Sequence, residues 1–521
     1  MINRRTFLKQ LGGGAAGLAT MIWLPGCTGT GARQSIAGIY SPESQGVASQ
    51  GLIDFLEAVN ASNLEFHSIM INRNGKLILE GWWEPFKKEY VHTLYSLSKS
   101  FTSTAVGMLY DEGKVKPADK VVSFFPDKLP AKVSDNLAAM SVHDLLTMHT
   151  GHTEDTMGKL RTGGDDWVKT FLSLEVPAVP GTHFLYNTGA TYMLSAIVQK
   201  VSGQNLMQFL TPRLFEPLAI QGADWEADPM GVNVGGYGLR IRTQDILNFG
   251  QLYLQEGEWN GKRLLSKEWI SEATRKQVNS QDNDSDWGQG YGYQFWRCKP
   301  GCYRGDGAFG QYCIVVPDKN AVIAITSETR DMGASMQLVW DHILPAMKDS
   351  PSLPDDPATE ERLRTMAAGL TLPIAGTSVA TNRKDQVNGK TYQFSENPYN
   401  AHRVSVSFAG EVCELTFEED GKTIRFKSGA GTWVTDGEKP GDSLFALRGR
   451  TPVRTAISSH YHWSDADTLV VTAKYVENAH HDVFTFVFSD DGLELKFGNS
   501  VSLFREQDDP RAPITAKLTS T

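Results

Sequence analysis

The spacing of apolar residues predicts a hairpin followed directly by a helix near the start of the chain. Two β-prone runs, 66–71 and 77–79, flank Asn74-Gly75. Asn-Gly between two such runs is the strongest short signal for a hairpin. Residues 96–110 then carry apolar side chains at helical spacing. The hairpin should therefore lead into a helix that opens near Ser96.

Helices dominate the predicted middle of the chain, and strands return at about residue 291. Helices are expected where capping residues precede apolar periodic segments and where glycines follow them. These segments are 142–146, 192–201 and 244–255. Strands are predicted at 291–296, 312–316 and 321–325. The order of strands, helices and strands indicates an α+β unit whose sheet is closed by both ends of the domain.

The last part of the chain changes to a pattern of period two. A stretch rich in Pro, Ser and Asp at 349–357 precedes this change, as linkers do. Beyond about Val387, apolar Val404, Val406 and Phe408 alternate with serines. The pattern predicts a second, all-β domain, which is a sandwich or a barrel.

The first residues have the composition of an export signal rather than of a folded element. Paired arginines at 4–5 precede an apolar stretch at 11–24, and this combination resembles an export signal of the twin-arginine pathway. Residues 24–27 read Leu-Pro-Gly-Cys and resemble a lipobox, in which the thiol of Cys27 receives the lipid. A soluble signal cleaved near Gly31, or an uncleaved anchor, is the alternative. We expect a periplasmic or cell-envelope protein, exported by the twin-arginine pathway and lipid-anchored at Cys27.

These patterns divide the chain into six segments. They are an export signal with lipobox at 1–27, a flexible lead at 28–48, the α+β domain at 49–346, a linker at 347–386, the all-β domain at 387–508 and a tail at 509–521.

Composition narrows the classes of protein and partner. Hydrophobic residues make up 40% and charged residues 21% of the 521 residues, as in globular proteins. The formal net charge of -10 leaves no basic excess to neutralise phosphates, so we expect no nucleic-acid partner. A small molecule or cell-wall or peptide-like material fits better as substrate. Five cysteines are too few for a disulfide scaffold.

Ser96 and Lys99 are the first candidate catalytic residues. They are three residues apart at a predicted helix start, so they share one face of the helix. A serine needs a base to attack an acyl carbon, and a lysine made neutral by burial can take its proton. The competing interpretation is a helix cap with a solvated lysine.

Two further segments carry candidate chemistry. Tyr186 precedes a predicted helix and could serve as a phenolate base or a proton relay, or simply as a core tyrosine. Gly307 lies in a glycine-rich segment ahead of an apolar strand, where backbone can approach a substrate or form a plain turn. A backbone N–H at Ala308 would complete an oxyanion hole with that of Ser96. Asn187, Asp306 and Gly307 are the candidate substrate-binding residues.

Taken in this order, the three segments resemble the serine β-lactamase and penicillin-binding superfamily, especially its class C and esterase branch. Residues from about 50 to 345 take part in the resemblance. It implies a β-lactamase-like fold, with an antiparallel sheet flanked by helices, and no metal or cofactor. It also implies that Ser96 is the acylated nucleophile, with Lys99 and Tyr186 managing the protons.

The third segment departs from the family pattern. The family has lysine or histidine two residues before the glycine that Gly307 matches, whereas this chain has Gly305 there. Because the lysine ordinarily helps to hold a substrate carboxylate, its absence weakens the case for penicillins. Residues 307–311 look instead like those of 6-aminohexanoate-oligomer hydrolases and related esterases. We therefore expect an exported serine hydrolase that cleaves an ester or amide.

Other interpretations remain open at this point. A β-lactamase or D,D-peptidase is the alternative enzyme, and a binding lipoprotein that keeps the fold without turnover is the alternative class. Several histidines, 149, 152, 460, 462, 480 and 481, are weaker candidates for metal ligands than for solvated or packed side chains. Cys298 and Cys302 could form a small disulfide or stay as two thiols.

Overall fold

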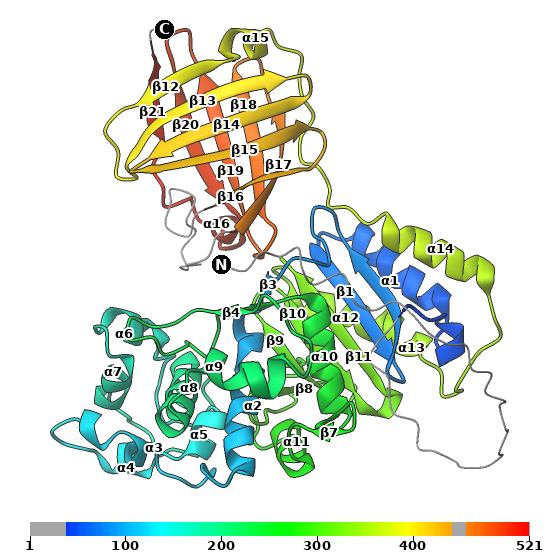
Figure 1. Ribbon diagram of the computed structural model, residues 1–521, viewed down its shortest axis with the longest axis vertical. Coiled ribbons are helices and arrows are strands. Elements are labelled where there is room, and N and C mark those ends of the chain that lie inside the picture. The colour runs from blue at the N-terminus through cyan, green and yellow to red at the C-terminus, as the bar shows by residue number, and fades with distance from the viewer. Residues whose placement is uncertain (1–37, 440–454, 520–521) are drawn as a thin grey trace, which may run out of the picture.

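The predicted hairpin forms one edge of the central sheet. In the computed structural model, which describes residues 38–439 and 455–519, β1 (Phe66–Arg73) and β2 (Lys76–Trp82) pair antiparallel (Figure 1). Asn74 and Gly75 turn the chain with φ of 54° and 71°, a region that suits both residues. The other edge of β1 pairs with β11 (Ala321–Ser327), so both ends of the domain meet in one sheet.

The complete sheet has the strand order β2-β1-β11-β10-β9-β8, and each pairing is antiparallel. The remaining strands are β8 (Trp296–Arg297), β9 (Tyr303–Gly307) and β10 (Gln311–Val316). Each face of the sheet has its own apolar core: α1 (Ser49–Ala61) packs on one face, and α2 (Ser98–Asp111), α8 (Thr188–Ser202) and α10 (Thr243–Leu254) supply the other. The predicted α+β fold with helices flanking an antiparallel sheet is confirmed.

The expected helix at 142–146 and the expected strand at 291–296 have different outcomes. Helix α5 (Val142–Leu146) forms, and a capping box between Ser141 and Asp144 caps its N-terminus. The strand prediction is wrong for most of its length, because only β8 forms there. Gln294 adopts a left-handed φ of 66°, and its side-chain amide donates to the carbonyl of Leu146 at 2.8 Å. This side chain holds the backbone out of the sheet.

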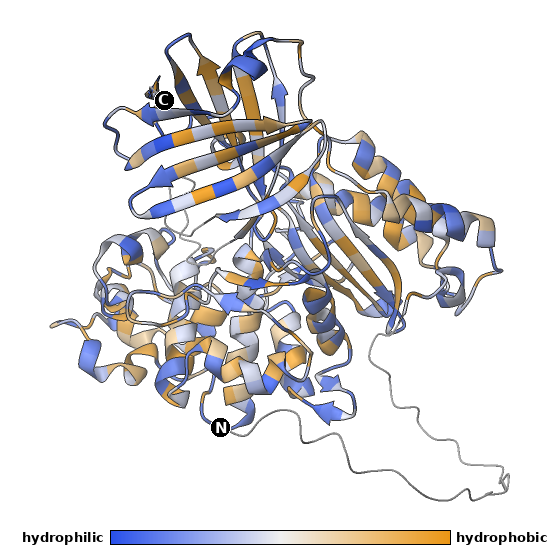
Figure 2. Ribbon diagram, turned by 45° about the horizontal axis from the view of Figure 1, so that its top comes forward, coloured by the Kyte–Doolittle hydropathy of each residue, from blue (hydrophilic) through white to orange (hydrophobic). Residues whose placement is uncertain are grey.

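The all-β domain is a closed barrel, one of the two predicted architectures. Its strands run from β12 (Lys390–Phe394) to β21 (Ile514–Leu518), mostly between sequence neighbours, and a parallel pairing of β15 (Lys422–Ala430) with β17 (Thr455–Trp463) completes the ring. Hydrophobic and hydrophilic residues alternate along its strands (Figure 2). The inward set, which includes Val404 and Val406, is fully buried.

The end of the chain is part of this barrel rather than the predicted tail. Residues 514–518 form β21, which pairs with both β12 and β20 (Gly492–Asn499). Ile514 and Ala516 are alternate residues of β21 that point into the barrel and are buried. Burial of these apolar side chains stabilises β21 as it does the neighbouring strands.

Parts of the predicted lead and linker also pack on the first domain. Tyr40 donates its backbone N–H to the carbonyl of Leu77 at 2.8 Å. Helix α14 (Pro357–Ala368) lies in the predicted linker, where its buried Leu363 joins the core beside α1. Among the described residues, no helix combines the length and the apolar character that a membrane crossing requires.

Candidate active site

Ser96 and Lys99 face each other at the start of α2. Ser96 lies in a 3-10 turn, Tyr95–Leu97, that runs directly into this helix. The Nζ of Lys99 is 3.0 Å from the Oγ of Ser96, and it donates to the carbonyl of Gly236 at 2.8 Å. Ser96 is half-buried, whereas Lys99 is only 1% exposed. The serine is thus reachable from outside, and its partner amine is shielded from bulk water.

Burial changes the acid–base character of Lys99. Desolvation lowers its pKa to about 7, although the carboxylates of Asp155 and Asp306 act in the opposite direction. A substantial neutral fraction therefore exists near neutral pH, and neutral amine can accept the proton of Ser96. This pair can carry out nucleophilic attack without a metal ion.

Tyr186 lies beside both Lys99 and Ser96. Its ring centroid is 4.8 Å from the Nζ of Lys99, and the ring stacks on Trp296 with centroids 5.5 Å apart. Burial raises the pKa of Tyr186 well above its ordinary value, against the opposing effect of a hydrogen bond with Ser96. The phenol therefore keeps its proton at neutral pH. Of the two predicted roles, this favours the proton relay over the phenolate base.

The third segment lies beside the turn that carries Ser96. Gly307 ends β9 so close to that turn that a Cβ there would be 2.0 Å from the carbonyl oxygen of Leu94. Ala308 follows it and is exposed. The placement of Gly307 agrees with a backbone N–H of Ala308 aimed at the oxyanion position, which stays a prediction. The glycine is needed here because no side chain fits between strand and turn.

Asp306 has partners within the protein rather than an open carboxylate. Its Oδ2 accepts hydrogen bonds from Arg304 Nε at 2.9 Å and from Trp287 Nε1 at 3.0 Å. Asp306 is 6% exposed, and burial raises its pKa, with Arg304 opposing the shift. With these partners, Asp306 is better placed to act as a charge that raises the pKa of Lys99 than to bind a substrate directly.

Asn187 is a structural residue, which corrects its predicted role in substrate binding. The side chain is fully buried and caps α8, where its Oδ1 accepts from the backbone N–H of Gly189 at 3.1 Å. The same oxygen accepts from Thr156, and its Nδ2 donates to Thr150 at 3.2 Å. Its polar atoms are therefore used in joining α8 to the loop before α6 (Met157–Thr162).

Two further groups at the site, from Gly236 and Asp155, are not among the predicted site residues. The carbonyl of Gly236 fixes the Lys99 amine, and the glycine leaves room because a Cβ would be 2.6 Å from Thr188. Asp155 accepts hydrogen bonds from the backbone and hydroxyl of Thr188 at 2.9 and 2.7 Å. Both depend on loops that meet only in the folded chain.

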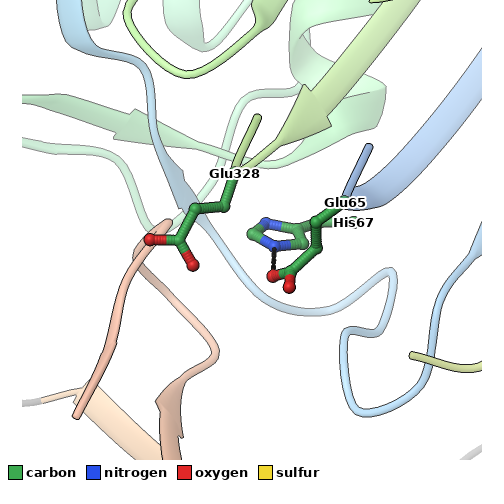
Figure 3. Close-up of side chains that lie close together, drawn as sticks. All are labelled: Glu65, His67 and Glu328. Carbon is green, nitrogen blue, oxygen red and sulfur yellow. Dashed lines mark hydrogen bonds and ion pairs between the residues drawn. The ribbon is translucent and has the colours of Figure 1, made fainter. Parts of the chain in front are cut away.

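One cluster of potential metal ligands lies outside this site, within the described part of the chain. Side-chain atoms of Glu65, His67 and Glu328 lie within 4.8 Å of one another (Figure 3). The barrel residue Lys474, however, places its Nζ 2.5 Å from Glu65 and 3.7 Å from Glu328. The two carboxylates of the cluster therefore share an ion-pair partner from the barrel.

The predicted weak metal candidates are held by other contacts. His149 and His152 each pair through Nδ1 with their own loop, at Thr147 and Thr150 respectively. His460 is buried, with its ring against Trp433. His480 and His481 both contact Glu328, at the junction of the two domains.

Cys298 and Cys302 are free, buried thiols that interact with each other. Arg304 donates to the Sγ of Cys298 at 3.3 Å, and the hydrogen bond with Cys298, together with burial, raises the pKa of Cys302. A disulfide between them stays a prediction for an oxidising compartment.

Comparison with known proteins assigns the first domain. Residues 63–348 match the family described as Beta-lactamase, which covers more than half of the chain. A 6-aminohexanoate-dimer hydrolase of Paenarthrobacter ureafaciens is 25% identical over 288 residues, covering 51% of this chain and 73% of that protein. Penicillin-binding protein 4 of Amycolatopsis lactamdurans is 26% identical over 270 residues, covering 44% and 70%. The octameric penicillin-binding protein homologue from Pyrococcus abyssi shares 17% identity at a TM-score of 0.47, covering 89% of this chain and 99% of that chain.

Proposed function

Because this chain belongs to the β-lactamase family, we propose that it is a serine hydrolase that forms an acyl-enzyme on Ser96. The observation that carries the proposal is the distance of 3.0 Å between Ser96 Oγ and the buried Nζ of Lys99, whose pKa burial lowers to about 7. Such a pair supplies both the nucleophile and its base.

The reaction follows from the positions of these groups. Lys99 takes the hydroxyl proton of Ser96 while Oγ attacks the carbonyl carbon, and the backbone N–H groups of Ser96 and Ala308 stabilise the negative oxygen. Tyr186, protonated and near both residues, passes its proton to the leaving group and takes back from Lys99 the proton that came from Ser96, so both residues return to their starting forms. Water then attacks the acyl-enzyme by the reverse route, which frees Ser96 and releases the acid.

We further propose an ester or amide substrate rather than a penicillin. The family's cation two residues before Gly307 is replaced by Gly305, where a Cβ would be 2.4 Å from Leu97 and 2.6 Å from Ser100. A lysine side chain therefore has no room at this position. The neighbouring cation, Arg304, is fully buried in its pair with Asp306, so neither position on β9 offers a free charge to a substrate carboxylate.

The test of this function is labelling by a fluorophosphonate, which reacts with activated serines. Wild type should be labelled on the peptide that contains Ser96, and Ser96→Ala should not. The substrate class is then determined from the turnover of short-chain esters, short amides, a cephalosporin and a D-alanyl peptide. Equal labelling of Ser96→Ala would overturn the nucleophile. Faster turnover of the cephalosporin than of the esters would favour a β-lactamase, and labelling without any turnover would favour a binding protein.

We also propose export by the twin-arginine pathway and a lipid anchor at Cys27, which lies outside the described residues. The sequence of residues 4–27 supports this proposal. The test is detergent phase partitioning of wild type and Cys27→Ser expressed with the full leader. Wild type should enter the detergent phase and the variant the aqueous phase; equal partitioning would contradict the anchor.

A further inference from the structure

We propose that His480, a residue of the barrel, is a positioning residue of the active site that acts through Tyr95. This inference rests on the proposed nucleophile, Ser96, which directly follows Tyr95 in the chain. His480 immediately precedes β19 (His481–Phe488), on the side of the barrel that meets the first domain. Its Nε2 forms a hydrogen bond with the hydroxyl of Tyr95, and its Nδ1 lies 2.5 Å from Glu328 Oε1.

The two hydrogen bonds link a carboxylate, an imidazole and a phenol, and the carboxylate fixes the direction of the first one. Glu328 is fully buried, which by itself raises its pKa, but the neighbouring His481 and His480 outweigh burial and hold the pKa well below the usual range, so Glu328 is ionised and can only accept. The Nδ1 of His480 must then carry a proton. Burial raises the pKa of Tyr95, so its hydroxyl keeps its proton and forms the hydrogen bond with Nε2 as a neutral phenol. A carboxylate, an imidazole and a phenol thus form one hydrogen-bonded chain from Glu328 to Tyr95.

The backbone of Tyr95 explains why this chain matters for the nucleophile. Tyr95 has a φ of 47°, a left-handed conformation that non-glycine residues hold only where their surroundings fix them. This turn sets the direction in which the chain runs through Ser96 into α2. Fixing the Tyr95 side chain therefore fixes the position of Ser96 Oγ against Lys99.

The same imidazole also reaches the oxyanion side of the site. Phe309, which follows Ala308, packs edge-on against His480 with ring centroids 4.7 Å apart, and it lies 5.3 Å from the ring of Tyr95. One side chain of the barrel thus contacts the residue before the proposed nucleophile and the residue after the proposed oxyanion donor. This double contact distinguishes His480 from a residue that only joins two domains.

The interface around His480 is built to keep it in place. Lys474 forms an ion pair with Glu65 at 2.5 Å, and His481 contacts Glu328 at 3.0 Å. Val476, on the same side of the barrel, is fully buried within the apolar core of the first domain. The barrel is therefore fixed at the site by charge pairs and by apolar packing together.

The test compares two replacements of His480 in the full-length protein. Glutamine places a polar atom near the Nε2 position and can still form a hydrogen bond with Tyr95, whereas asparagine reaches only the Nδ1 position and Glu328. We expect His480→Asn and Tyr95→Phe each to lower kcat for a p-nitrophenyl ester roughly 10- to 100-fold with little change in KM, as a small misplacement of a nucleophile does. His480→Gln should retain most of the activity. The double variant should be no slower than either single variant, because both remove one interaction.

Thermal unfolding and the rate of fluorophosphonate labelling are measured for the same variants. The control is His402→Asn, because His402 is an exposed barrel histidine paired with Asp420. Wild-type kcat in His480→Asn and Tyr95→Phe would overturn the positioning role. Equal losses in the Gln and Asn variants, tracking their unfolding temperatures, would also overturn it in favour of simple domain docking. Failure of the proposed function is distinguishable, since wild type itself would then show no labelling of Ser96.

Discussion

Arg304 and Asp306, two residues apart on the same face of β9, form an ion pair of 2.9 Å that is almost entirely closed to water. The pair flanks Gly305, the position at which the family carries a cation. Its carboxylate raises the pKa of Lys99, which burial otherwise lowers. The third segment of this chain therefore contributes a buried carboxylate, paired with Arg304, that affects the pKa of Lys99.

Asp306→Asn should move the pH–rate profile and weaken the fold. Loss of the carboxylate removes a charge that favours the ammonium form, so the pKa of Lys99 should fall below about 7 and the acid limb of kcat/KM should move to lower pH. The charge of Arg304 is then buried and unpaired, which costs about 3–5 kcal/mol in comparable sites.

The matched control for that variant is Asp284→Asn, which breaks an exposed pair with Lys299. Its unfolding free energy should change by about 0–1 kcal/mol, and its pH profile should not move. An acid limb that stays at the wild-type pH in a folded Asp306→Asn would show that the carboxylate does not act on Lys99.

Lys99→Arg and Lys99→Met should both lose hydrolysis by orders of magnitude. Arginine keeps a charge and much of the bulk but does not deprotonate in proteins, and methionine offers no base. In wild type, activity should rise with pH through about 7 as the ammonium of Lys99 loses its proton. The measurement is kcat/KM from pH 5 to 9 on variants of matched thermal stability. Near-native turnover in the arginine variant would place the base elsewhere.

Lys99→Met should also be more stable than wild type at low and neutral pH. The folded-state pKa of Lys99 is lowered to about 7 from roughly 10.4 in the unfolded chain, so the unfolded state binds the extra proton between these values. The cost of the buried ammonium is therefore complete below pH 7 and declines as pH rises toward 10. Denaturant unfolding at pH 6 and pH 9 should show a larger advantage for Lys99→Met at pH 6; an advantage that grows with pH would contradict the lowered pKa.

The sequence predicts those parts of the site that depend on local geometry or on family motifs. Ser96 and Lys99 meet because residues three apart at a helix start share a face. The contact of Lys99 with Gly236 joins residues 137 positions apart, and that of Tyr95 with His480 joins residues 385 positions apart. No local pattern reports such pairs, because they form only when loops and domains pack.

The misplaced elements have the same origin. The segment at 291–296 has the composition of a strand, but the amide of Gln294 bonds to the end of α5 and takes the backbone out of the sheet. Asn187 is displaced by one residue from the family's asparagine, whose position Thr188 occupies, and its buried side chain caps α8. Both outcomes depend on which tertiary partners are within reach.

Tyr186→Phe should lower kcat without moving the acid limb of the pH profile. The phenol is protonated at neutral pH because burial raises its pKa, so its role is to pass a proton rather than to titrate. Loss of a positioned proton donor typically lowers kcat by about 10²- to 10⁴-fold. Phenylalanine keeps the stacking on Trp296, so stability should change little. A shift of the acid limb in this variant would mean that Tyr186 contributes to the titration now assigned to Lys99.

Gly307→Ala should impair the reaction more than it impairs the fold. A Cβ at this position would be 2.0 Å from the carbonyl of Leu94, so β9 must move away from the turn that carries Ser96. The N–H of Ala308 moves with it, and loss of one oxyanion donor costs about 10²–10³-fold in kcat. The control is Gly158→Ala in α6, where a Cβ meets no atom within 4 Å and alanine favours the helix. Measured kcat and KM for both variants decide the point: unchanged kcat in a folded Gly307→Ala would place the oxyanion site away from β9.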